Sequence, residues 1–168
     1  MKQVFKLLFA ATLLSNFLLA PGCKKDDGGD DPGTSVQILP GQGLNNLKIG
    51  DPAQKAFDAF GSVSDSYFEF GGKYYHFLLY LSKGIAVNLE PTNSATLDLN
   101  TKILDISLST PYSGQTDKKI GIGSTKTAVE AAYGTPDSID PLDGDKYNIG
   151  IAFDYGGGTT VETITVFK

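Results

Sequence analysis

The stretch GIGSTKT, residues 121–127, contains the residue types of a phosphate-binding loop: glycines, a lysine and a hydroxyl side chain. In such a loop a glycine stands directly before the lysine, and a buried strand precedes it. Here Thr125 precedes Lys126, and the related stretch that begins at Ile49 keeps neither the lysine nor the threonine. We therefore interpret residues 121–137 as the start of a helix rather than as a nucleotide site.

Catalytic and metal-binding residue types are scarce. His76 is the one histidine, Cys23 is the one cysteine, and no nucleophile-elbow motif occurs. Acyl-transfer catalysis needs a nucleophile beside a base and an orienting acid, and zinc sites are built mainly from histidine and cysteine. The sequence therefore predicts a non-enzymatic protein without a cofactor.

Four aspartates cluster in the stretch TPDSIDPLDGDKY, and their oxygens suit a calcium ion. The spacing of a calcium-binding loop is absent, and Asp-Pro and Asp-Gly pairs also serve as turns without any ion. Turns are the preferred interpretation, and a weak calcium candidate remains at Asp137, Asp140, Asp143 and Asp145.

An aromatic run at residues 74–81 reads as a strand that is apolar on both faces. One set of its side chains belongs in the core, and the other would lie on the outer face of a sheet. Tyrosine-rich patches bury much area at low entropic cost and suit protein partners. The alternative is that loops or the other half of the chain cover the run. The candidate partner-binding face comprises Tyr74, His76, Tyr80, Asn88 and Asp105.

The chain matches itself at a shift of 73 residues, with residues 49–62 lying over residues 122–135. Beyond residue 74 a deletion aligns GIAVNL with GIAFDY and ILDISL with VETITV. Repeated patterns at a fixed spacing indicate duplicated structural units. We predict repeat unit 1 at residues 38–110 and a shorter repeat unit 2 at residues 111–168.

Each unit is predicted to begin with a short helix. Asp51 and Ser124 are the expected N-caps, Pro52 suits the first helical position, and Gly61 and Gly134 suit the C-terminal caps. Alternating apolar residues then predict strands at 85–89, 104–108, 151–155 and 164–166. The predicted fold class is α+β, with two tandem helix–β-meander repeats that form an antiparallel sheet with short helices packed on one face.

The first 37 residues have the pattern of a targeting and anchoring segment. Residues 1–22 have the basic start and short apolar run of a signal peptide, which ends at Cys23. The stretch LAPGC resembles the lipobox of bacterial lipoproteins, which implies lipidation of Cys23; a plain signal peptide with an incidental cysteine is the alternative. Residues 23–37 are predicted to be a lipidated, acidic tether. Its acidic run resembles the export tag of surface lipoproteins, or it is a solvated spacer.

The pattern Ile122-Gly123-Ser124, Tyr133-Gly134-Thr135-Pro136 and the closing GIAFDY and VETITVF resemble known proteins. They resemble the β-lactamase-inhibitor-protein-like fold and the small outer-membrane lipoproteins of the SmpA/OmlA assembly type. The resemblance covers about residues 41–168 less loops, and it implies a binding or scaffolding module rather than an enzyme. The chain departs from those families in having one evident helix per unit and no cysteine pair.

All 14 basic residues are lysines, and two of them precede Cys23, which leaves 12 lysines against 19 acidic residues after cleavage, a net charge of −7. Nucleic-acid binding depends on basic side chains, so it is not expected. We expect a lipoprotein anchored by Cys23 to the outer membrane of a Gram-negative bacterium, with the cell surface and the periplasmic face as the two alternatives for its location. Its partner is expected to be a protein or an envelope component. The alternatives are a protein inhibitor of an extracellular or periplasmic enzyme, and a small-ligand-binding lipoprotein.

Overall fold

The computed structural model of the 168-residue chain describes residues 37–141 and 143–168. These residues belong to one compact unit, Val36–Lys168. The predicted signal peptide, Cys23 and nearly all of the predicted tether lie outside the described residues. Within the described residues, no helix has both the length and the hydropathy needed to cross a membrane.

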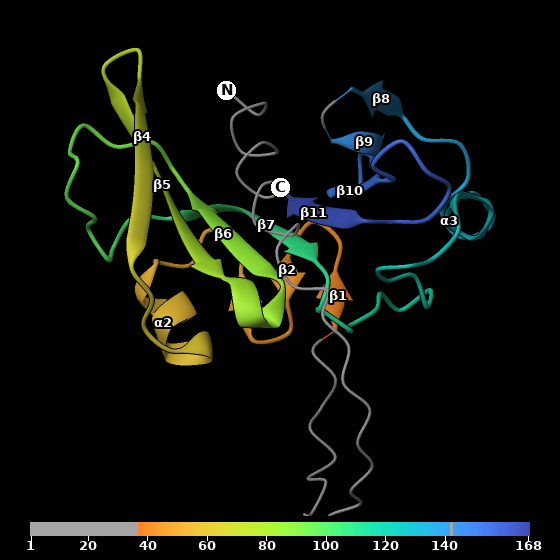
Figure 1. Ribbon diagram of the computed structural model, residues 1–168, viewed down its shortest axis with the longest axis horizontal. Coiled ribbons are helices and arrows are strands. Elements are labelled where there is room, and N and C mark those ends of the chain that lie inside the picture. Colours follow the sequence, from red (N-terminus) through yellow and green to blue (C-terminus); the bar gives the residue numbers. More distant parts are fainter. Residues whose placement is uncertain (1–36, 142) are drawn as a thin grey trace, which may run out of the picture. The chain divides into compact units, whose positions relative to one another are not determined.

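Eight strands form one antiparallel sheet in the order β4-β5-β6-β7-β11-β10-β9-β8 (Figure 1). The first four and the last four strands each form a meander, and the two meanders meet where β7 pairs with β11. The short connections between neighbouring strands explain the antiparallel pairing. The strands are β4 (Asp65–Phe70), β5 (Lys73–Tyr80), β6 (Ile85–Leu89), β7 (Ile103–Ser109), β8 (Ser138–Asp140), β9 (Gly144–Tyr147), β10 (Ile151–Asp154) and β11 (Thr163–Phe167).

A three-stranded sheet and two short helices complete the unit. The small sheet has the order β1-β2-β3, and the helices precede the two meanders in the chain. A single 3₁₀ turn, Leu81–Lys83, joins β5 to β6. The bounds are β1 (Ile38–Leu39), β2 (Gly43–Leu44), β3 (Leu47–Lys48), α2 (Gln54–Phe60) and α3 (Lys126–Tyr133).

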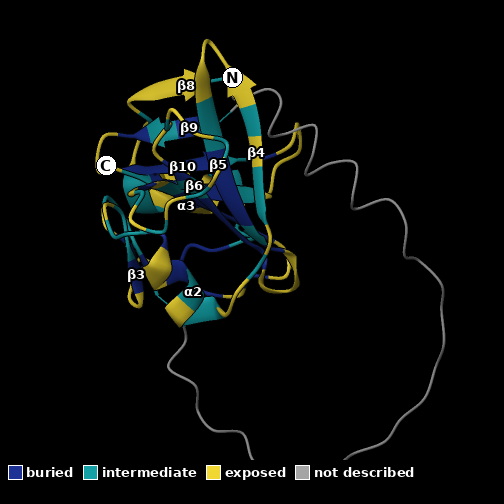
Figure 2. Ribbon diagram, turned by 90° about the vertical axis from the view of Figure 1, so that its left-hand side faces the viewer, coloured by how far each residue is buried: buried dark blue, intermediate teal, exposed yellow. Residues whose placement is uncertain are grey.

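The core lies on one face of the large sheet, and we call this the inner face. Because paired strands present their partners on the same face, the register places Leu78, Val87, Ile106 and Val166 in one inner row. All four are fully buried (Figure 2). The small sheet and both helices contribute buried side chains to the same cluster: Ile38, Leu44, Leu47, Ala53, Ala56 and Val129.

The predicted fold class, α+β with two tandem helix–β-meander repeats and short helices packed on one face of the sheet, is wrong. The described residues are mostly β, with eleven strands against two α-helices of seven and eight residues. The three-stranded sheet shares the inner face with these helices, and only Ala56 of α2 and Val129 of α3 are buried within them. The sequence pattern missed β1 to β4, β8 and β9, because most of these strands are too short to display a clear alternation.

The predicted helix caps need correction. Helix α3 is capped by Thr125, whose hydroxyl accepts a hydrogen bond from the Ala128 N–H, and not by Ser124. Helix α2 begins after Ala53 without a side-chain cap, while the Asp51 carboxylate accepts the Lys48 N–H. The predicted glycines do follow the helices, since Gly61 and Gly134 have φ values of 91° and 81°.

Candidate functional site

The predicted partner-binding residues do not form one surface. Tyr74, His76 and Tyr80 point to the inner side of β5, where His76 is 1% exposed and Tyr80 is 3% exposed. Asn88 and Asp105 face each other on the opposite side of the sheet, and the Asn88 amide donates a hydrogen bond to the Asp105 carboxylate. The residues of β5 that share this side with Asn88 are Tyr75, Phe77 and Leu79.

The side of the large sheet opposite the core is the outer face. Its most apolar part lies on the β4–β5 hairpin, where Phe68 stacks on Tyr75 with ring centroids 5.0 Å apart. Phe77 continues the row, with its centroid 6.5 Å from that of Phe68, and Phe70 stands near the hairpin turn with 58% of its surface exposed. We call Phe68, Phe70, Tyr75 and Phe77 the aromatic outer face.

Small and polar side chains occupy the outer face further along the sheet. Ala86, Ser107, Thr165 and Ala152 follow one another across four strands, and the hydroxyls of Ser107 and Thr165 lie 3.3 Å apart. Within the described residues, every helix and every strand outside the large sheet contributes to the inner core cluster instead. Phe77, Ala86 and Ala152 on this face are buried, with 6%, 0% and 1% of their surfaces exposed, so its accessible aromatic part consists of Phe68, Phe70 and Tyr75.

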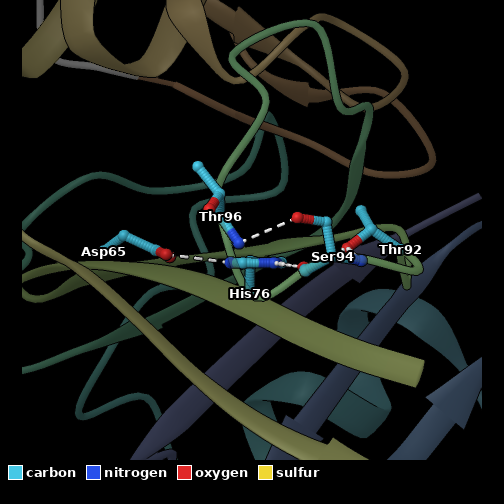
Figure 3. Close-up of polar contacts among 5 residues, drawn as sticks. All are labelled: Asp65, His76, Thr92, Ser94 and Thr96. Carbon is cyan, nitrogen blue, oxygen red and sulfur yellow. Dashed lines mark hydrogen bonds and ion pairs between the residues drawn. The ribbon is translucent and has the colours of Figure 1, made fainter. Parts of the chain in front are cut away.

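His76 joins the hairpin to the loop at residues 90–102. Its Nδ1 lies 2.9 Å from Asp65 Oδ2 on β4, and its Nε2 lies 2.9 Å from the Ser94 carbonyl oxygen (Figure 3). A catalytic triad would need Nε2 to face a nucleophile. In this structure a backbone carbonyl occupies that position. The buried histidine therefore connects β4 with the loop at residues 90–102 through hydrogen bonds.

The four aspartates of the calcium candidate have separate hydrogen-bond and ion-pair partners. Asp137 accepts the Asn148 N–H at 2.7 Å, and Asp140 accepts the Asp143 N–H at 3.3 Å. Asp143 pairs loosely with Lys146, and Asp145 pairs with Lys126. In the described part of the chain, no group of three or more His, Cys, Asp or Glu side chains is placed to hold a metal ion.

Asp145 is a buried carboxylate beside α3. Its Oδ2 lies 3.0 Å from the Lys126 Nζ, and the ammonium also lies 5.1 Å from the centroid of the Tyr155 ring. Burial, followed by the negative charge of Asp145, raises the pKa of Tyr155 above its ordinary value and that of Tyr147 to about 12. In this cluster the Lys126 ammonium is attracted to both the Asp145 carboxylate and the Tyr155 ring.

The sequence analysis missed β4, which supplies Asp65, Phe68 and Phe70. A signal was present: residues 65–70, DSYFEF, end at two glycines, and Gly-Gly is a strong hairpin turn. Gly71 and Gly72 have φ values of 60° and 73°, which L-residues with a side chain rarely adopt. The hairpin thus depends on Gly71 and Gly72.

Comparison with known proteins gives one solved structure of similar fold. No protein-family model matches the chain, and no curated protein matches it. A crystal structure of the uncharacterized protein yfeY from Escherichia coli aligns with a TM-score of 0.52 and 15% sequence identity. The alignment covers 79% of this chain and 100% of the E. coli chain. At this identity the likeness concerns the fold alone.

Proposed function

We propose that this protein is a non-enzymatic, outer-membrane lipoprotein that binds another protein through the aromatic outer face. Cys23 carries the lipid in this proposal, and the acidic residues that follow it tether the folded unit to the membrane. The proposal replaces the predicted set of binding residues, because that set was divided between the two faces of the sheet.

The observation that carries the proposal is the arrangement of aromatic rings on the β4–β5 hairpin. Four aromatic side chains share one face there, and three of them, Phe68, Phe70 and Tyr75, are at least partly exposed, while Phe77 is 6% exposed. The described helices and the small sheet pack on the other face. Exposed apolar side chains that gather in one place, unlike single ones, mark interaction sites. Aromatic residues are enriched in the centres of protein interfaces, where they account for much of the binding energy.

Charge favours a protein as the partner. From Cys23 onward the chain has 12 lysines against 19 acidic residues and no arginine, and this net charge of −7 disfavours nucleic acid as the partner. Polar groups beside the rings, such as the Asn88 amide, suit the polar rim that surrounds the apolar centre of an interface.

The test uses a photocrosslinking amino acid in intact cells that make the full chain. One variant carries it at Phe70 on the outer face, and the matched variant carries it at Tyr67, which is 50% exposed on the other side of the same strand. We expect a discrete crosslinked protein from position 70 only. Replacement of Tyr75 by serine in the position-70 variant should abolish the product.

Equal products from both positions, or a product that survives Tyr75→Ser, would reject the aromatic outer face as the binding site. The anchor is tested separately by metabolic labelling with a clickable fatty acid. Label on the wild type that disappears in Cys23→Ser supports the lipoprotein assignment, and an unlabelled wild type contradicts it.

A further inference from the structure

The His76–Asp65 pair lies where the β4–β5 hairpin meets the loop at residues 90–102. The imidazole is 1% exposed, and both of its nitrogens are within hydrogen-bonding distance of oxygen atoms (Figure 3). The Tyr67 ring lies beside it at a centroid distance of 5.5 Å. The ring is thus enclosed by the strand, the neighbouring strand and the loop.

Counting donors and acceptors fixes the number of protons in this pair. The Ser94 carbonyl oxygen can only accept, so Nε2 carries a proton. The bond between Nδ1 and Asp65 Oδ2 requires a second proton, carried either by the ring or by the carboxyl group. In both descriptions the pair holds two protons and has no net charge. If the pair loses one proton, two lone pairs face each other at a site that is shielded from water.

The second acceptor belongs to a loop that is held by local hydrogen bonds and by further contacts with β5. One of these contacts is the hydrogen bond that the Lys73 ammonium donates to the Asn93 side-chain oxygen at 2.6 Å. The Ser94 carbonyl also accepts the Thr92 hydroxyl at 2.8 Å, and the Ser94 hydroxyl accepts the Thr96 N–H at 3.0 Å. Thr92 is bridged to Tyr74 on β5 by two backbone hydrogen bonds of 2.9 Å. Most side chains of residues 90–96 are exposed, so His76 provides the buried contact of this segment.

We propose that His76 and Asp65 form a proton-dependent latch that holds residues 92–96 against the hairpin. With two protons on the pair the segment is closed, and loss of one proton as the pH rises lets it open. The latch does not depend on the proposed binding function, although it acts on the hairpin that carries the aromatic outer face.

Asp65 Oδ1 is buried and has no hydrogen-bond partner among the described residues, so the imidazole is the group that offsets this carboxylate. Strand β6 brings no charged side chain to the site. The other titratable and charged groups on the surrounding segments are Tyr67 and Glu69 on β4, Lys73, Tyr74, Tyr75 and Tyr80 on β5, and Glu90, Asp98 and Lys102 on the loop.

The test is an NMR titration of the intact protein in detergent micelles. Nitrogen–proton correlations of the His76 ring report the protonation of each nitrogen, and amide hydrogen exchange, corrected for base catalysis, reports the opening of residues 92–96. We expect two ring signals typical of protonated nitrogens in the closed state. Between the pH at which the open segment releases the second proton and the higher pH at which the closed pair releases it, the opening equilibrium should rise about tenfold per pH unit, as expected for the release of one proton.

The Asp65→Asn variant provides the matched control. Its amide N–H can donate to an unprotonated Nδ1 while Nε2–H still donates to Ser94, so the segment should stay closed throughout that pH range. The His76→Gln variant, which has no titrating group, should likewise lose the pH dependence if the first variant folds poorly. Opening that is independent of pH in the wild type, or the same pH dependence in wild type and variants, would overturn the latch.

Discussion

The two meanders use the same strand order and differ in what extends beyond the shared core. In the first, β4 and β5 have six and eight residues, and a long loop at residues 90–102 joins β6 to β7. In the second, β8 and β9 have three and four residues, and the corresponding loop spans residues 155–162. The additional length of the first meander carries the aromatic outer face and the latch.

The His76–Asp65 pair of the first half and the Lys126–Asp145 pair of the second half differ in which partner is buried. In the first half the base is buried and the acid is partly accessible, with side-chain exposures of 0% for His76 and 20% for Asp65. In the second half the acid is buried and the base is accessible, with 3% for Asp145 and 41% for Lys126. A buried histidine can exchange its proton near neutral pH, whereas lysine keeps its charge there. The first pair therefore suits a response and the second suits permanent stabilisation.

The largest effect on the free energy of unfolding is expected under alkaline conditions, where the buried tyrosines of the two halves can be compared. Burial raises the pKa of Tyr80 in the first half to about 12, and burial with the Asp145 charge does the same for Tyr147 in the second. Unfolded tyrosines ionise near pH 10 while these stay protonated. Each should therefore lower the free energy of unfolding by about 1.4 kcal/mol per pH unit between pH 10 and 12.

Urea unfolding at pH 9 to 11.5 measures this slope. Tyr80→Phe and Tyr147→Phe should each reduce the slope by the share of one tyrosine. Near pH 8, Tyr147→Phe should cost more, because its hydroxyl donates to the Gly134 carbonyl while that of Tyr80 has no hydrogen-bond partner within the described residues. An unchanged slope in either variant would show that its tyrosine ionises equally when folded and unfolded.

An intermediate effect is expected when the second ion pair is broken. Lys126→Met keeps the length of the side chain but leaves the Asp145 carboxylate without its ammonium partner. We expect a loss of about 2 kcal/mol at pH 7, less than for a fully buried pair because the lysine is partly solvated. Urea unfolding measures the loss, and adding Asp145→Asn should restore part of it. A loss equal to that of exposed pairs would mean that the two halves do not differ as described.

The smallest effect concerns the helices that precede the two meanders. Thr125→Ala removes the side-chain cap of α3 and should cost about 1 kcal/mol in the free energy of unfolding. Thr127→Ala, on an exposed position within the same helix, is the matched control and should be neutral or slightly stabilising. If both substitutions have the same effect, α3 gains nothing from its cap and resembles the uncapped α2.

The sequence predicted the strands whose residues alternate clearly. It failed where the outcome depends on contacts between segments that are distant in the chain. Strands β5, β6, β7, β10 and β11 lie where the alternating residues placed them, and the glycines after both helices were recognised. The face of β5 was not decidable, since Tyr75 and Phe77 are as apolar as Tyr74 and Leu78. Pairing of Leu78 with Val87 settles it, and that contact depends on the register of the sheet.

The candidate site was predicted only in part. The aromatic strand and the polar pair Asn88 and Asp105 were found, but Tyr74, His76 and Tyr80 were placed on the wrong side of that pair. The partners of His76 come from β4 and from the loop at residues 90–102, neither of which shows a periodic signal for this contact. The duplication of the chain and its lipidation remain predictions.

The position of β11 has a consequence for biosynthesis. This strand is the last of the folded unit to leave the ribosome, yet it lies in the middle of the large sheet, between β7 and β10. Val166 on β11 lies between Ile106 of β7 and Ile151 of β10, and Ile164 lies between Leu108 and Phe153 of the same two strands. The two halves therefore cannot join into one sheet until the last strand of the unit has been synthesised.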